Sequence, residues 1–327
     1  EFAFSGVGIN PHHGTPSNVG ALAVDATPRI PGGSTSGGAA HVAGGAAWAA
    51  LGSDTRGSIR VPAALQGLVG FKNTQVLTPA DGYVPLAPTF DTTCAITRSV
   101  RDAVLLHEVL AARRIEAVPR PSRALRLALP LGTLLEGLDA TVARAFERSL
   151  ELCRAAGAQI VDVRLPAGPD PAAASGRISA IEAWAWHRGR LDERHGLYDP
   201  RVLARIRMGR DIDAAEHAEL LAERAAWSHQ VRLMIEEFDA LVCPTVPMVA
   251  PPLQPLIDDD SAFFATNALL LRNPSLVNYL DGCALSLPCQ HAGELPVGLM
   301  LWAPAHHDER VLQTALAVES VLAAALR

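Results

Sequence analysis

The stretch Gly52–Arg60, with the sequence GSDTRGSIR, carries more information than any other part of this chain. Like the earlier stretch Pro31–Gly38, PGGSTSGG, it places small hydroxyl residues among glycines. Glycine allows backbone conformations and close approaches that a side chain would forbid. Consecutive N–H groups in such a loop can point at one developing negative charge, as an oxyanion hole requires. The two stretches are therefore candidates for nucleophilic chemistry, in which a serine also needs a base within hydrogen-bond reach.

Other interpretations of these loops stay open at this point. Taken separately, runs rich in glycine and serine are usually structural turns. A phosphate-binding loop would end in Gly-Lys-Ser or Gly-Lys-Thr, and the sequence contains neither tripeptide. A relay of serine, histidine and aspartate is also compatible with the sequence, because the members of such a triad come from any part of a chain.

Two pairs of adjacent histidines, His12-His13 and His306-His307, raise the question of a metal site. Adjacent histidines on a loop more often lie in solvent, and we find no carboxylate cluster at metal-ligand spacing around them. We therefore expect no metal and no cofactor.

Charge and cysteine content limit the classes of partner. The net charge of −6 is modest and gives no indication of a basic face, so we expect neither nucleic acid nor a membrane surface as a partner. The five cysteines are odd in number and scattered, which is typical of reduced thiols in a cytoplasmic protein. No apolar run reaches the length needed to span a bilayer.

Hydrophobic patterns predict alternating strands and helices. Leu125–Leu129 has the pattern of a strand, Ala140–Ala156 of a helix and Gln159–Leu165 of a second strand. Strand, helix and strand at this spacing imply a parallel, right-handed crossover. Further predicted elements are a buried helix at Ser36–Leu51, strands at Gly67–Lys72, Ala240–Pro244, Ala284–Pro288 and Val297–Trp302, an amphipathic helix at Arg98–Ala112 and a closing helix at Asp308–Leu326.

These elements predict an α/β fold. We expect a single large domain whose central sheet is mixed, mostly parallel and covered by helices on both faces. Residues 170–236 are rich in alanine, glutamate and arginine and mostly helical in pattern, so we expect a helical insertion there.

The two serine-containing stretches, followed by Val61–Ala64 and Gly67–Lys72, resemble the signature region of the amidase signature family. The resemblance extends over nearly the whole chain. The other matching segments are Glu1–Ala3, Asn10-Pro11 and Gly14–Pro16 upstream, and Asp91–Asp102, Asp239–Pro247, Ser286–Pro288, Pro296–Leu299 and Asp308-Glu309 downstream.

The family resemblance implies a Ser-Ser-Lys relay. In that family one serine is the nucleophile, and a second serine, preceded by a cis peptide bond, passes the proton to a lysine. Ser58 matches the nucleophile and Ser34 the cis-serine. The backbone N–H groups that match the oxyanion hole belong to Thr55, Arg56, Gly57 and Ser58.

Neighbours of the two serines have supporting or open roles. We expect Asp54 and Arg60 to form a buried pair that holds the loop, and Thr35 keeps a hydroxyl where the family commonly has serine. Arg56 stands where the family often has glycine. It either selects substrates or points to solvent.

The catalytic lysine that the resemblance implies is not in this sequence. Lys72, the only lysine, matches a separate family position after the signature. Because the family's catalytic lysine precedes the cis-serine, we interpret residues 1–327 as an amidase signature domain that lacks its amino-terminal segment. The alternative is a catalytically inactive relative that binds a ligand or partner.

The implied function is an amidohydrolase that cleaves the C–N bond of a small amide through a seryl acyl-enzyme. An alternative is the glutaminase-like component of a tRNA-dependent amidotransferase. That component typically has glutamine where this chain has Val61, and Gly-Arg-Val-Ser where this chain has Asn73–Leu77. Both differences favour the stand-alone enzyme, for which a homodimer stays open.

Overall fold

Short apolar runs form the strands of one central sheet in the computed structural model, which describes residues 2–325. Eight strands lie in the order β1-β3-β2-β7-β8-β6-β4-β5. Their bounds are β1 Ala50–Ser53, β2 Val69–Lys72, β3 Thr93–Thr97, β4 Arg126–Pro130, β5 Gln159–Val163, β6 Ala240–Pro244, β7 Cys283–Pro288 and β8 Gly298–Ala303. Two residues named in the predictions, Glu1 and Leu326, lie outside the described residues.

The sheet is mixed, as predicted, but it is mostly antiparallel. Of the seven strand pairs within residues 2–325, the β4–β5 and β4–β6 pairs are parallel and the other five are antiparallel. The parallel crossover predicted from residues 125–165 is present, but it forms one edge of the sheet, where β4 pairs with β5. In the middle of the sheet β7 and β8 are joined by a short connection, which permits only antiparallel pairing.

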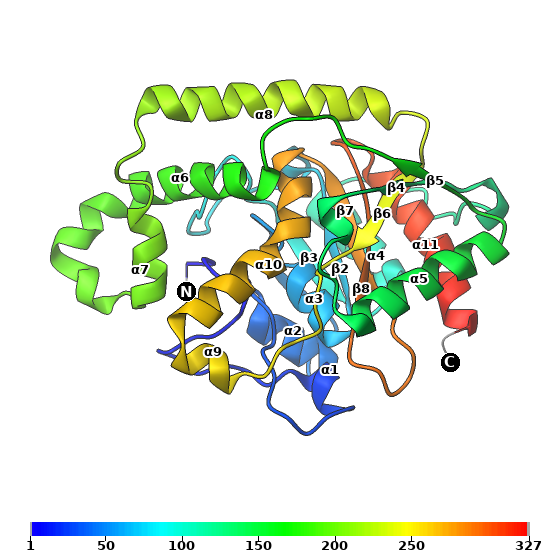
Figure 1. Cartoon of the computed structure of the whole chain (residues 1–327), viewed down its shortest axis with the longest axis horizontal. Helices are drawn as coiled ribbons and strands as arrows, with labels where there is room; N and C mark the ends of the chain where they lie inside the picture. Colours follow the sequence, from blue (N-terminus) through cyan, green and yellow to red (C-terminus); the bar gives the residue numbers. More distant parts are fainter. Residues whose placement is uncertain (1, 326–327) are drawn as a thin grey trace.

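Helices cover both faces of the sheet, as predicted. One core cluster joins the sheet to α4, α5 and α11, and another joins it to α6, α7, α8 and α10. Figure 1 shows α6 and α8 running side by side with α7 at their far end. The helices are α1 Val19–Leu22, α2 Ser36–Ala43, α3 Arg60–Gln66, α4 Val100–Leu110, α5 Ala140–Ala155, α6 Pro171–Arg194, α7 Pro200–Arg207, α8 Ala214–Met234, α9 Gln254–Asp258, α10 Asp260–Tyr279 and α11 Asp308–Ala325, with 3₁₀ turns at Gln75–Leu77, Ser122–Ala124, Thr133–Leu135 and His195–Leu197.

The central strands contribute side chains to both cores, because successive side chains of a strand point to opposite faces of the sheet. In β8, Leu299 and Leu301 enter the core beneath α11, whereas Met300 and Trp302 enter the core beneath α6 and α10. All four side chains are buried. This two-sided burial explains why the central strands are uniformly apolar.

The predicted helix at Ser36–Leu51 is wrong in its second half. Helix α2 ends at Ala43 and is followed by Gly44 and then Gly45, whose φ of 74° no longer fits a helix. The chain then enters β1 at Ala50. The small apolar composition was therefore compatible with a strand as well as with a helix.

Residues 170–236 are mostly helical, as expected. Asp170, Asp199 and Asp213 cap α6, α7 and α8 by accepting backbone N–H groups, and a proline opens both α6 and α7. The interpretation of this segment as an insertion stays a prediction. Within residues 2–325, no helix combines the length and apolar character needed to cross a bilayer.

Candidate active site

The two serine loops meet at the starts of α2 and α3. Ser34 lies just before α2, and Ser58 lies just before α3. The Thr35 N–H donates to the Ser58 carbonyl at 3.2 Å, which ties one loop directly to the other. The Gly33–Ser34 peptide bond is cis, as the family resemblance implied. Two stretches that are separated in sequence by most of α2 and the start of β1 therefore form one site.

The ion pair expected between Asp54 and Arg60 is present and fully buried. Arg60 Nη2 lies 2.8 Å from Asp54 Oδ1, and Nε lies 3.0 Å from Oδ2. The same carboxylate accepts the N–H groups of Gly57 at 2.8 Å and Ile59 at 3.3 Å. Asp54 thus fixes the backbone on both sides of Ser58.

Asn278 of α10 completes this network. Its Nδ2 donates to Asp54 Oδ1 at 3.1 Å, and its Oδ1 accepts from Arg60 Nη2 at 2.6 Å. Burial raises the pKa of the Asp54 carboxyl, but Arg60 and the other nearby donors outweigh that effect and lower it to about 2. Asp54 is therefore ionised at neutral pH and acts as a structural acceptor.

The Ser58 loop presents main-chain N–H groups that could stabilise an oxyanion. Within residues 2–325, the N–H groups of Thr55, Arg56 and Ser58 make no hydrogen bond, whereas that of Gly57 is held by Asp54. The Thr55 hydroxyl donates to Asp91 at 2.6 Å, which anchors the start of the loop. Of the four N–H groups predicted for an oxyanion hole, three are thus unoccupied.

Gly57 is required by its backbone conformation and by its surroundings. Its φ is 121°, and an added Cβ would lie 2.6 Å from Cβ of Pro274.

We expect Gly57→Ala to lower the free energy of unfolding by about 2–3 kcal/mol and to reduce any activity, because the new methyl group displaces the Ser58 loop. Urea denaturation measures the change. The matched control is Gly189→Ala, at an exposed position of α6 with nothing within 4 Å of the added Cβ. A Gly57→Ala protein as stable as this control would contradict the prediction.

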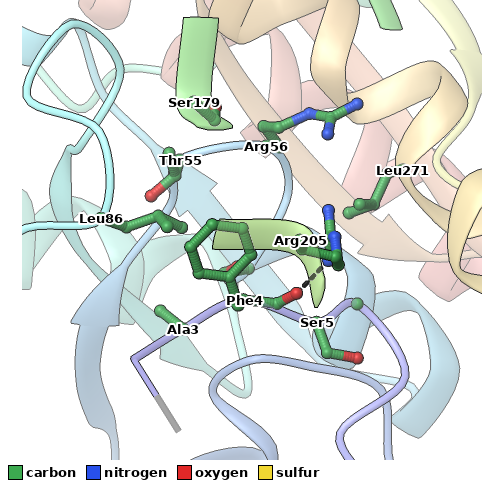
Figure 2. Close-up of a pocket in the computed structure, with 11 residues that line it drawn as sticks. Ala3, Phe4, Ser5, Thr55, Arg56, Leu86, Ser179, Arg205 and Leu271 are labelled. Atoms are coloured by element: carbon green, nitrogen blue, oxygen red, sulfur yellow. Dashed lines mark hydrogen bonds between the residues drawn. The ribbon is translucent and has the colours of Figure 1, made fainter. Parts of the chain in front are cut away.

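A narrow pocket opens beside Ser58. Ser58 is only 4% exposed, and it lines the pocket together with Thr55 and Arg56. Ser34 and Gly57 are not among the described lining residues. Figure 2 shows the other walls, which come from distant parts of the chain and include Phe4, Leu86, Ser179, Arg205 and Leu271.

Arg56 does not point to solvent. Its Nε donates to the Ser275 hydroxyl of α10 at 3.2 Å, and its Nη2 donates to the Ala172 carbonyl of α6 at 2.6 Å. Of the two possibilities that the sequence left open, a side chain in solvent is therefore wrong, and selection of substrates by Arg56 stays a prediction.

Lys72 is engaged by main-chain acceptors and, within residues 2–325, makes no hydrogen bond to either serine. Its Nζ donates to the carbonyls of Asn73 at 2.8 Å and Gly282 at 2.7 Å. Burial is the main cause that lowers the pKa of its ammonium group, with Arg60 acting in the same direction and Asp54 opposing it. Lys72 therefore links the end of β2 to the start of β7 and supplies no base to the site.

Several site residues escaped the sequence analysis. Asn278, Ser179 and Arg205 lie far from Ser58 in sequence, in helices without a recognisable motif. Asp91 belongs to one of the segments that resemble the family, and the sequence gives no other indication that it lies at the site. Their places depend on tertiary packing rather than on local pattern.

Comparisons with known proteins give a family model, relatives of similar sequence and solved structures of similar fold. The family model described as Amidase matches residues 1–312. The 2-amino-5-chloromuconic acid deaminase of Comamonas testosteroni is 31% identical over 329 residues, covering 98% of this chain and 70% of that protein. The A component of the glutamyl-tRNA(Gln) amidotransferase of Thermus thermophilus is 32% identical over 335 residues, covering 91% and 69%. A crystal structure of an amidase superposes with a TM-score of 0.85 at 31% identity, covering 98% and 72%.

Proposed function

Because this chain belongs to the Amidase family, we propose that it hydrolyses the C–N bond of a small amide through an acyl-enzyme on Ser58. The observation that carries the proposal is the position of Ser58. Ser58 lines the pocket, its loop carries three unoccupied main-chain N–H groups, and its carbonyl is tied to the Ser34 loop through the Thr35 N–H. A serine nucleophile needs donors for the oxyanion and a group that takes its proton.

In the proposed reaction, Ser58 Oγ attacks the amide carbon while its proton passes to Ser34 Oγ, and Ser34 gives up its own hydroxyl proton at the same time towards the amide nitrogen. The carbonyl oxygen gains negative charge and accepts hydrogen bonds from the N–H groups of Thr55, Arg56 and Ser58. The C–N bond then breaks as the nitrogen takes up a proton, which leaves an ester on Ser58. Water attacks this ester, so the products are a carboxylic acid and ammonia or an amine.

The lysine implied as the last member of the relay is not among residues 1–327. Ser58 and Ser34 are the members of the proposed relay within these residues, and Lys72 is occupied elsewhere. The activity assays below use the whole natural protein.

We expect Ser34→Ala to lower kcat by about 10²–10³-fold with little change in KM, because removal of a proton relay acts on the chemical step. Steady-state kinetics measure both constants. The control is Ser36→Ala, at the first residue of α2, which keeps the Ser34 hydroxyl. Equal kcat values for the Ser34→Ala and control proteins would remove Ser34 from the mechanism.

A panel of amides tests the proposed activity. Ammonia or amine release is followed for aliphatic, aromatic and urea-like amides, and for 2-amino-5-chloromuconic acid, which the name of one relative specifies. Hydrolysis of at least one amide that is lost in Ser58→Ala supports the proposal. No hydrolysis of any member by the full-length protein contradicts it.

The second candidate function is that of the glutaminase-like component of a tRNA-dependent amidotransferase, since several relatives at 30–32% identity are the A components of such enzymes. Val61 and Asn73–Leu77 argue against it for the reasons given above. Glutaminase activity that appears only when the other components of an amidotransferase are added would favour this second function.

A further inference from the structure

Two arginines from different elements meet in the pocket beside Ser58. Arg56 precedes Ser58 by two residues, and Arg205 lies in α7. Both line the same pocket as Ser58, and Figure 2 shows their guanidinium groups on the same side of it, next to Leu271. Burial, followed by the charge of Arg205, lowers the pKa of Arg56 to about 9, so the two charges interact. Burial lowers the pKa of Arg205 to about 10, and both groups remain cations at neutral pH.

Neither cation has an acidic partner within residues 2–325. Arg56 is held by the neutral acceptors Ser275 and Ala172. Arg205 Nη1 donates to the Phe4 carbonyl, and its guanidinium carbon lies 5.1 Å from the centre of the Phe4 ring. These contacts fix the two side chains and leave their positive charges uncompensated.

The negative charge of Asp170 raises the pKa of Arg56, but it offsets only part of the fall caused by burial and by Arg205. The Asp170 carboxylate caps α6 by accepting the Ala172 N–H at 2.9 Å. It is therefore engaged at the helix terminus. Two like charges in a partly desolvated site are unfavourable, and an anion between them would relieve the cost.

Helix α6 completes the wall. An added Cβ at Gly176 would lie 3.1 Å from Nη1 of Arg56, so the absence of a side chain there lets the guanidinium lie against the helix. Ser179, one turn further along, lines the pocket and is 4% exposed. Its Oγ has no hydrogen-bond partner within the described residues. A buried hydroxyl without a partner is costly unless a ligand supplies one.

From these contacts we infer that Arg56, Arg205 and Ser179 form a carboxylate-binding subsite, and that the substrate is an amide that carries a carboxylate. This inference rests on the proposed function for the reacting end of the substrate. Guanidinium groups bind carboxylates through paired, charge-assisted hydrogen bonds, which a neutral substrate cannot match. The subsite would place the acid group on the side of Ser58 that faces α6 and α7.

Two pairs of compounds of matched shape test the inference in the full-length protein. Each pair consists of an acid amide and its neutral diamide: succinamate with succinamide, and 3-carbamoylbenzoate with isophthalamide. For the pair that is hydrolysed faster, we expect kcat/KM of the acid amide to exceed kcat/KM of the neutral diamide by about 10–100-fold. This is the range that a charge-assisted hydrogen bond supplies.

Arg205→Met is the informative variant, because Arg205 lies on a different element from the nucleophile. We expect it to raise KM for the acid amide with little change in kcat, and to change KM for the neutral diamide much less. Arg205→Lys should restore part of the preference. The control is Arg207→Met, at an exposed position at the end of the same helix. Thermal melting of each variant verifies the fold.

Calorimetric titration of Ser58→Ala with the same compounds separates failure of the inference from failure of the proposed function. Binding of the acids without hydrolysis by the unmodified protein would keep the subsite and overturn the hydrolase. Hydrolysis of acid and diamide with equal kcat/KM, unchanged by Arg205→Met, would overturn the subsite and keep the hydrolase. Failure of both acids to bind at millimolar concentration would also overturn the subsite.

Discussion

Replacing Ser58 by alanine should lower kcat by about 10⁴-fold or more, which is the loss seen when a serine hydrolase loses its nucleophile. The substitution removes only one oxygen, which makes no hydrogen bond within the described chain. The fold and the loop around residue 58 should therefore persist, because Asp54 holds the loop through the main chain of Gly57 and Ile59. Steady-state assays on the best amide of the panel measure the loss, and thermal melting shows that the variant is folded.

Ser53→Ala is the matched control for Ser58→Ala. Ser53 lies in the same glycine-rich stretch, at the end of β1 and five residues before Ser58. Its hydroxyl takes no part in the proposed chemistry, so this variant should retain activity within a few-fold of the unmodified protein. Residual activity of Ser58→Ala within tenfold of this control would show that another group performs the attack.

The second large effect is expected on stability. Replacing Arg60 by methionine should lower the free energy of unfolding by about 3–5 kcal/mol, because it leaves the Asp54 carboxylate buried without its charged partner. Both side chains are completely buried, and Arg60 makes hydrogen bonds to both Asp54 oxygens and to Asn278. Urea denaturation followed by circular dichroism measures the change.

Arg154→Met provides the comparison for the buried pair. Arg154 forms an ion pair with Glu147 at 3.4 Å on the surface of α5, with both side chains well exposed. A pair of this kind contributes less than about 1 kcal/mol. If Arg60→Met proved no more destabilising than Arg154→Met, the Asp54–Arg60 pair would not be what holds the Ser58 loop.

Local features of the site could be predicted because their partners are close in sequence. Asp54 and Arg60 are six residues apart in one stretch, and their pairing follows from the tight turn between them. The two serine loops were recognisable from their glycines. The central strands were also predictable as apolar runs, since each strand supplies side chains to two cores.

Long-range features could not be predicted from local pattern. Strand direction depends on which strands become neighbours, so a single parallel crossover gave the wrong expectation for most of the sheet. Asn278 reaches Arg60 across 218 residues of sequence. Arg205 enters the pocket from a helix whose sequence shows only an ordinary amphipathic pattern. Such contacts are decided by packing between elements, which no single stretch encodes.

The most direct measurement is covalent labelling of the full-length protein with a fluorophosphonate probe. Attack by an activated serine forms an O–P bond and expels fluoride, so the product marks the nucleophile itself. Peptide mass spectrometry should locate one adduct, on Ser58, and the adduct should be absent from Ser58→Ala and slowed in Ser34→Ala. The absence of any adduct, an adduct on another residue, or equal labelling of Ser58→Ala would contradict the assignment of Ser58 as the nucleophile.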